Sequence, residues 1–130
     1  MTTTRHPVDR FLDDMAAGQG IGTDYWAGDA RLDATVPNWR FDRHGAEAVA
    51  AQLSGWYNVP ITIDSVTRTE VPGGETVRLD LSWVEGGVPY AAHQVHLLAL
   101  DGDRIASDTV FCGGRWSAAL LAQMEDARVG

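Results

Sequence analysis

Residues 75–116, ETVRLDLSWVEGGVPYAAHQVHLLALDGDRIASDTVFCGGRW, predict three successive strands joined by two tight turns. Apolar and polar side chains alternate from Thr76 to Val84, which is the period-two pattern of a strand with two unlike faces. Gly86-Gly87 and Asp101-Gly102 are residue pairs that favour a two-residue hairpin turn. The segment is therefore expected to form an antiparallel meander.

The two turns also predict which residues face each other across the strands. His93 is expected opposite Asp80 across the first turn and opposite Val110 across the second, and Val95 is expected opposite Asp108. One face of the meander would then carry Arg78, Asp80, Ser82, His93, Val95, Leu97, Asp108, Val110 and Cys112. This face is either a solvated surface or the lining of an interior, and we expect the interior.

The opposite face of the same strands is largely apolar, and His96 and Gln94 lie on it. An apolar sheet face needs cover from another layer or from another subunit. We therefore expect a homodimer formed through Val77, Leu79 and Leu81.

The rest of the chain completes an α+β pattern. Helices are predicted at residues 7–17, 23–27, 46–57 and 117–128, and further strands at 31–36, around Phe41, and at 61–71. Helices followed by a run of antiparallel strands predict an α+β domain whose N-terminal helices close one face of a strongly curved sheet. Residues 1–130 are expected to form this single domain.

Composition excludes several classes of function. The net charge is −8 with no basic cluster, which argues against a nucleic-acid or anionic-lipid partner. A single cysteine excludes an intramolecular disulfide, and His93 and His96 would point to opposite faces of a strand, so no metal site is expected. No apolar run resembles a signal peptide or a membrane span, and the protein is expected to be soluble and cytoplasmic.

Residues 36–57, VPNWRFDRHGAEAVAAQLSGWY, and the turn LDGDRI at 100–105 resemble the nuclear transport factor 2-like superfamily, in particular its SnoaL-like branch. The resemblance covers nearly the whole chain. It implies a cone-shaped, cystatin-like α+β barrel, often dimeric through the convex sheet face, with a pocket between the third helix and the concave face. Members include ketosteroid isomerases, polyketide cyclases, limonene-type epoxide hydrolases and non-catalytic binders.

Two groups within the superfamily suggest roles for individual residues. Arg78-Leu79-Asp80 is similar to the Arg-x-Asp of limonene-type epoxide hydrolases. The position of that group's second catalytic carboxylate is occupied in this chain by Val110, and the nearest acidic residue is Asp108. That group's water-holding tyrosine and asparagine are replaced before Pro37 by Asp33 and Thr35. SnoaL-like cyclases instead pair a histidine and an aspartate on the last two strands, and the resemblance gives those parts to His93 and Asp108.

The predicted function is cofactor-free acid–base chemistry on a hydrophobic polyketide-, steroid- or terpenoid-like metabolite, as cyclisation, isomerisation or epoxide opening. Asp80 and Asp108 would be the acid–base groups, Arg78 would orient them and His93 would donate a proton, because burial and neighbouring charge poise such groups near neutrality. The pocket is expected to be lined by Tyr25, Trp26, Trp39, Trp56, Ser82, Val95, Val110 and Cys112.

The alternative is a non-catalytic ligand-binding or dimeric assembly module of the same fold. In that interpretation Asp80 forms only an ion pair with Arg78, and His93 is a hydrogen-bonded structural residue. The tryptophans would then be ordinary core residues.

Overall fold

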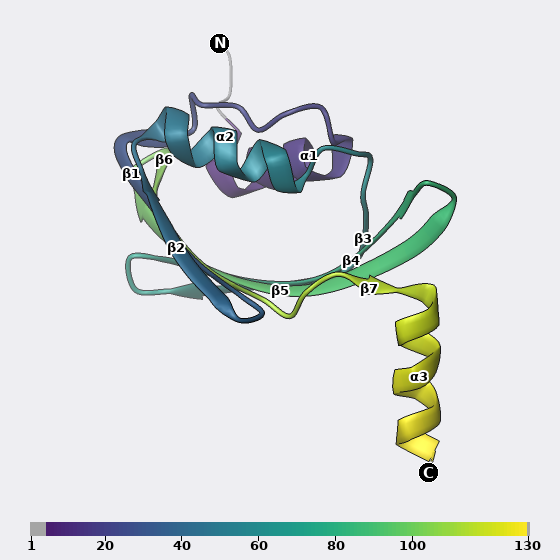
Figure 1. The fold of residues 1–130 in the computed structure, drawn as a ribbon. Helices are drawn as coiled ribbons and strands as arrows, with labels where there is room; N and C mark the ends of the chain where they lie inside the picture. The colour runs from purple at the N-terminus through teal and green to yellow at the C-terminus, as the bar shows by residue number, and fades with distance from the viewer. Residues whose placement is uncertain (1–4, 130) are drawn as a thin grey trace.

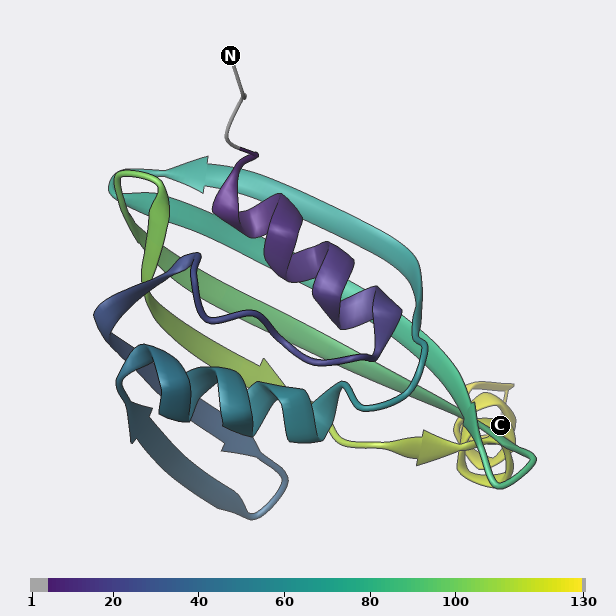
Figure 2. The same ribbon diagram turned by 90° about the horizontal axis from the view of Figure 1, so that it is seen from above.

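The computed structural model describes residues 5–129 and consists of a curved mixed sheet with two helices on its concave side (Figures 1 and 2). The elements are α1 (Pro7–Ala17), β1 (Trp26–Val36), β2 (Trp39–His44), α2 (Ala46–Trp56), β3 (Thr62–Val71), β4 (Gly74–Glu85), β5 (Val88–Asp101), β6 (Arg104–Cys112), β7 (Trp116–Ser117) and α3 (Ala118–Val129). The predicted α+β class with helices over a curved sheet is confirmed.

The sheet has the strand order β2-β1-β6-β5-β4-β3, with the short β7 paired to β5. The β1 and β6 strands run parallel, and the other neighbouring pairs are antiparallel. Because β2 and β3 lie at opposite ends of this order, the sheet is an open cone and does not close into a barrel. The predicted meander of β3, β4, β5 and β6 is confirmed.

Helix α1 begins and ends where its sequence indicates. Pro7 occupies the first turn, where its missing N–H costs nothing, and the ring of His6 accepts a hydrogen bond from the backbone N–H of Val8 at 3.2 Å. Gly18 ends the helix with φ at 67°, a conformation that favours glycine, and a Cβ there would lie 2.0 Å from the carbonyl oxygen of Val59. The buried face of the helix consists of Val8, Phe11 and Met15.

The helix predicted at residues 23–27 is wrong. The backbone N–H of Trp26 bonds to the carbonyl of Thr23 at 3.3 Å, which gives one turn, and β1 then begins at Trp26. Pairing of β1 with β6 and complete burial of the Trp26 ring outweigh the local helix signal. The helix predicted at 46–57 is confirmed as α2, with Tyr57 as its C-cap.

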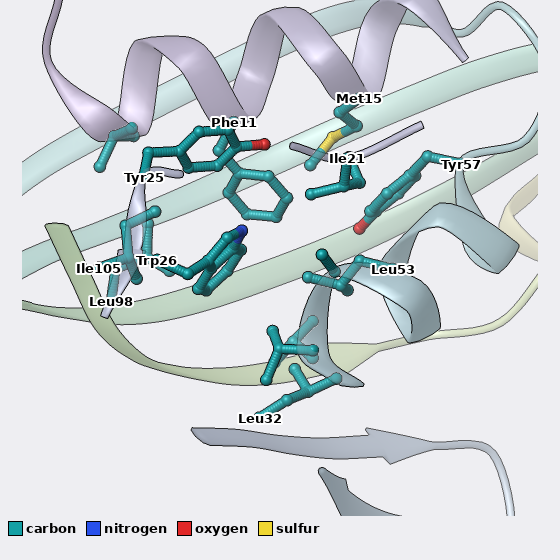
Figure 3. Close-up of a cluster of buried hydrophobic side chains, with 14 of the residues drawn as sticks. Phe11, Met15, Ile21, Tyr25, Trp26, Leu32, Leu53, Tyr57, Leu98 and Ile105 are labelled. Atoms are coloured by element: carbon teal, nitrogen blue, oxygen red, sulfur yellow. The ribbon is translucent and has the colours of Figure 1, made fainter. Parts of the chain in front are cut away.

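The core fills the space between the two helices and the concave sheet face (Figure 3). The Phe11 ring meets the Trp26 ring edge to face at 5.2 Å and lies 6.4 Å from the Tyr57 ring. The apolar residues of β4, Val77, Leu79 and Leu81, belong to this core and are at most 2% exposed. A dimer through these three residues is therefore wrong, because their side chains face the helices of their own chain.

Helix α3 lies apart from the other helices, on the convex side of the sheet (Figure 1). Most of its residues are exposed, and its contacts are with β7 and β5 at its first end. None of the helices within residues 5–129 has the length and apolar composition that a membrane crossing requires.

Candidate active site

The register of the first hairpin is confirmed. Asp80 pairs with His93 and Arg78 with Val95 across the Gly86-Gly87 turn, whose glycines have φ values of 56° and 77°. A two-residue turn of this kind needs positive φ at both positions, which glycine supplies without strain. The neighbours predicted for β4 and β5 are therefore correct.

The register of the second hairpin differs from the prediction. Asp101 pairs with Arg104, so the central turn residues are Gly102 and Asp103, with φ at 60° for Gly102. A bulge follows between Ala99 and Leu100. Asp108 consequently lies opposite Leu98, where Val95 was expected, and this odd-numbered shift moves its side chain to the other face of the sheet.

The polar residues predicted to line the interior are divided between the two faces. Asp80 and His93 lie on the convex face, where their ion pair of 3.0 Å is open to water, with side chains 43% and 62% exposed. Arg78, Ser82 and Val95 share this outer face by strand alternation. Their predicted interior placement is wrong, because the apolar residues between them take the inner face.

Asp108 lies inside the cone, and its partner is His96. Oδ2 of Asp108 is 2.7 Å from Nδ1 of His96, and both side chains are almost completely buried. The other ring nitrogen, Nε2, is 3.0 Å from Oε1 of Gln94. An oxygen that can accept a hydrogen bond therefore lies beside each ring nitrogen of His96, in the buried interior of the cone.

Tyr57 continues this chain of hydrogen bonds to the end of α2. Its hydroxyl donates to Oε1 of Gln94 at 2.5 Å and lies 3.3 Å from Nε2 of His96. Oδ1 of Asp108 has no hydrogen-bond partner among residues 5–129. Unpartnered buried polar atoms are few in folded proteins, and a functional role is one explanation for such an atom.

A pocket of about 430 Å³ opens beside this chain. It is lined by Val36, Pro37, Gly55, Trp56, Tyr57, Asn58, Val59, Ile61, Leu81, Trp83, Glu85, Ala92, Gln94, Cys112, Gly114 and Arg115. The inner end presents Tyr57, Gln94 and Cys112, and the amide of Gln94 donates to Sγ of Cys112 at 3.6 Å. His96 and Asp108 lie behind Gln94 and Tyr57, outside the lining.

Comparison with known proteins identifies the fold. Neither the models of protein families nor the curated proteins give a match to the sequence. Among solved structures, a nuclear transport factor 2-like protein from Anabaena variabilis is similar, with a TM-score of 0.72, 17% identity, and coverage of 83% of this chain and 84% of that chain. The chain has the nuclear transport factor 2-like fold.

Two further structures with this fold are similar to the chain. A protein from Catenulispora acidiphila with a ketosteroid isomerase-like fold, in complex with trimethylamine, has a TM-score of 0.60 and 20% identity over 85% of this chain and 88% of that chain. A nuclear transport factor 2-like protein of unknown function from Cytophaga hutchinsonii has a TM-score of 0.59 and 15% identity over 86% and 94%. Identities this low show the shared fold and leave the activity to be argued from the site.

Only part of the predicted lining borders the observed pocket. Trp56 and Cys112 line it. Tyr25, Trp26 and Val110 are buried in the core beneath the helices, and Trp39 is 67% exposed at the tip of the β1–β2 hairpin. Trp83 of β4, which the sequence did not place in the lining, borders the pocket as well.

The sequence did contain a signal for the residues that were missed. Gln94 and His96 alternate with the outward-facing residues of β5 and share their face with Leu79 and Leu81. A histidine on the more apolar of two faces is the one that folding buries. Within residues 5–129, no group of three or more His, Cys, Asp and Glu side chains is placed to hold a metal ion.

Burial raises the pKa of the Tyr57 phenol well above its ordinary value, and the charge of Asp108 raises it further. Burial and the hydrogen bond to Asp14 likewise raise the pKa of Tyr25. Both residues are therefore neutral hydrogen-bond donors at neutral pH. Tyr57 offers the inner end of the pocket a hydroxyl that keeps its proton.

These raised pKa values predict a loss of stability in alkali. A phenol whose folded pKa exceeds its unfolded pKa of about 10 contributes stability that is complete below that pH and is lost as the pH rises above it. We expect the free energy of unfolding, measured in urea, to fall as the pH rises above about 10. The fall should be smaller in Tyr57→Phe and smaller again in the Tyr25→Phe/Tyr57→Phe double variant. An equally steep fall in the double variant would assign it to other groups.

Proposed function

We propose that the cone binds a largely apolar small molecule and catalyses proton transfer at a carbonyl group whose oxygen accepts a hydrogen bond from Tyr57. The observation that carries this proposal is the buried chain of Tyr57, Gln94, His96 and Asp108 at the inner end of an apolar pocket. Sites that place a few convergent polar groups at the end of an apolar cavity are typical of ligand-binding and active sites.

The chemistry follows from the order of the groups. A carbonyl oxygen at the inner end would accept the Tyr57 hydrogen bond in place of Oε1 of Gln94, and loss of an α proton to water would then give an enolate that this hydrogen bond stabilises. Nε2 of His96 lies 3.3 Å from the Tyr57 oxygen and Nδ1 of the same ring lies 2.7 Å from Oδ2 of Asp108, so this pair would position the hydroxyl that stabilises the enolate. Return of the proton to the γ carbon of a conjugated enolate gives an isomer. Attack of the enolate carbon on a second carbonyl of the same molecule opens that carbonyl's π bond and gives a cyclised product, whose new alkoxide takes up the proton.

This proposal selects among the reactions that the resemblance implies. The carboxylate of the Arg-x-Asp pattern, Asp80, faces solvent on the convex side of the sheet, away from the pocket. The histidine–aspartate pair on the last two strands is present inside the cone, with His96 in the part first given to His93. Enol chemistry of the SnoaL-like kind is therefore better supported than epoxide opening, on a polyketide-, steroid- or terpenoid-like molecule.

A second candidate function is ligand binding without turnover. It is favoured by the complete burial of His96 and Asp108, since no charged side chain lines the inner end of the pocket among the described residues. The likeness to a protein solved with a bound small amine fits either function, because identity this low shows the shared fold alone.

Exchange of α protons in deuterated water separates the two functions. With 1-tetralone as the probe, we expect the protein to speed loss of the α-proton NMR signal, and Tyr57→Phe to reduce that acceleration about 100-fold, the size of the effect of removing one oxyanion donor. Tyr25→Phe is the matched control, since it removes a buried hydroxyl that lies outside the pocket. Binding of the ketone with no acceleration in the unmodified protein would establish the second function, and no binding would reject both.

A further inference from the structure

The charged residues that line the pocket lie at its rim. Of the residues that line the pocket, Glu85 and Arg115 are the only ones with a formal charge, and both lie at the end away from His96. Arg115 follows β6 and Glu85 ends β4, so two distant parts of the chain meet at this rim.

Each carboxylate oxygen of Glu85 accepts a hydrogen bond from a neighbouring side chain. Its Oε1 accepts a hydrogen bond from Nε1 of Trp83 at 2.8 Å, and its Oε2 accepts one from Nη2 of Arg115 at 2.9 Å. With both oxygens bound, the glutamate serves as a fixed support for the arginine.

The guanidinium of Arg115 contacts two aromatic rings and forms one hydrogen bond. It lies over the Tyr90 ring at 4.9 Å and near the Trp83 ring at 5.8 Å, and these two rings stack at 5.9 Å with 15° between their planes. A guanidinium has several N–H donors in a planar fork, and Glu85 is the one hydrogen-bond partner of Arg115 within residues 5–129. The side chain is 57% exposed, so the remaining donors are open to a ligand.

The backbone before Arg115 is shaped to place it at the rim. Gly114 has φ at 115°, where residues with a side chain are strained, and a Cβ there would lie 3.1 Å from the Pro37 ring. The N–H of Gly113 bonds to the carbonyl of His93 at 3.0 Å and anchors the start of this turn to β5. The turn therefore directs the arginine over the opening of the pocket.

We infer that Arg115 binds an anionic group of the ligand at the pocket rim, so that the ligand is an apolar acid whose carboxylate meets Arg115 while its body occupies the cone. This inference rests on the proposed function, because it assigns a substrate class to the same pocket. A planar guanidinium binds a carboxylate through two parallel hydrogen bonds. In a protein of net charge −8, an arginine at the opening also attracts acids that the rest of the surface repels.

Paired probes test the inference. Calorimetry would compare 1-naphthylacetate with 1-naphthylacetamide, which have the same ring system and differ in charge. We expect the acid to bind about 10-fold more tightly at low salt, and the difference to shrink as salt is added. Arg115→Gln should abolish the preference, while Arg104→Gln, which removes an exposed arginine in the β5–β6 turn, should keep it.

Each outcome bears on one of the two claims. Equal binding of the acid and the amide, or an equal preference in Arg115→Gln, would overturn the inference and leave the proposed pocket intact. Binding of neither probe would overturn the proposed pocket as well. Arg115→Lys retains the positive charge and loses the planar fork of donors, so it should keep part of the preference for the acid. That result would show that the loss of preference in Arg115→Gln is not caused by misfolding.

Discussion

Replacing Asp108 with leucine is expected to lower the free energy of unfolding by about 3 kcal/mol. The substitution leaves the His96 ring in the core without the carboxylate that faces its Nδ1 at 2.7 Å. Removing one member of a buried pair costs more than the pair contributes, because the remaining polar group stays desolvated. Urea denaturation followed by tryptophan fluorescence measures the change.

Two further variants show whether burial is the cause. Asp80→Leu breaks the Asp80–His93 pair on the convex face and is expected to cost less than about 1 kcal/mol, since that pair is exposed to water. The double variant His96→Phe/Asp108→Leu is expected to recover most of the loss, because an apolar pair replaces both members together. Equal costs for Asp80→Leu and Asp108→Leu would contradict the placement of these two aspartates.

Most of the helices and strands and the first hairpin were predictable because their signals are local. Residues 46–57 combine helix-favouring composition with apolar spacing, and Gly86-Gly87 fits a single kind of turn. Local chemistry therefore gave the correct pairing of Asp80 with His93. Local chemistry did not determine whether that pair faces the interior or the solvent, because other elements could cover either face of β4 and β5. The apolar residues decided it, since burying Leu79 and Leu81 against α1 and α2 removes more apolar surface from water.

The second hairpin was mispredicted because two turns compete in the same residues. Asp101-Gly102 as the turn pair would require positive φ at Asp101, whereas a turn centred on Gly102 and Asp103 requires it at glycine alone. The bulge beside Leu100 is stabilised from outside the hairpin, since the N–H of Leu100 bonds to the carbonyl of Gly73 at 2.9 Å. That long-range contact is invisible in the LDGDRI sequence. It turns Asp108 inward, and the candidate site depends on it.

Helix α3 and the convex sheet face point to a homodimer built differently from the one first expected. We propose that α3 of each subunit packs on the convex face of the other. That face exposes Leu97 and Phe111, which are 42% and 48% exposed, and α3 carries Leu120 with little cover from its own chain. A helix of this length is marginal in water unless it packs against something.

A second copy of the chain is the partner that fits both features at once. The two-fold symmetry of a dimer buries each helix and each sheet face in one self-complementary interface. The acidic residues Glu125 and Asp126 of α3 would then approach Arg31 and Arg78, which lie exposed on the sheet. The helix already leaves the sheet on its convex side (Figure 1).

Light scattering after size exclusion tests this dimer. We expect a dimer at micromolar concentration for the unmodified chain, and a weakening of about 100-fold in Phe111→Glu, because a charge would be buried at the centre of the interface. Val88→Glu, which adds the same charge at the β4–β5 hairpin tip, should remain dimeric. A chain ending at Ser117 should also dissociate while its fold is kept, because α3 contributes nothing to the core. A monomeric unmodified protein, or a dimer indifferent to Phe111→Glu and to loss of α3, would reject the arrangement.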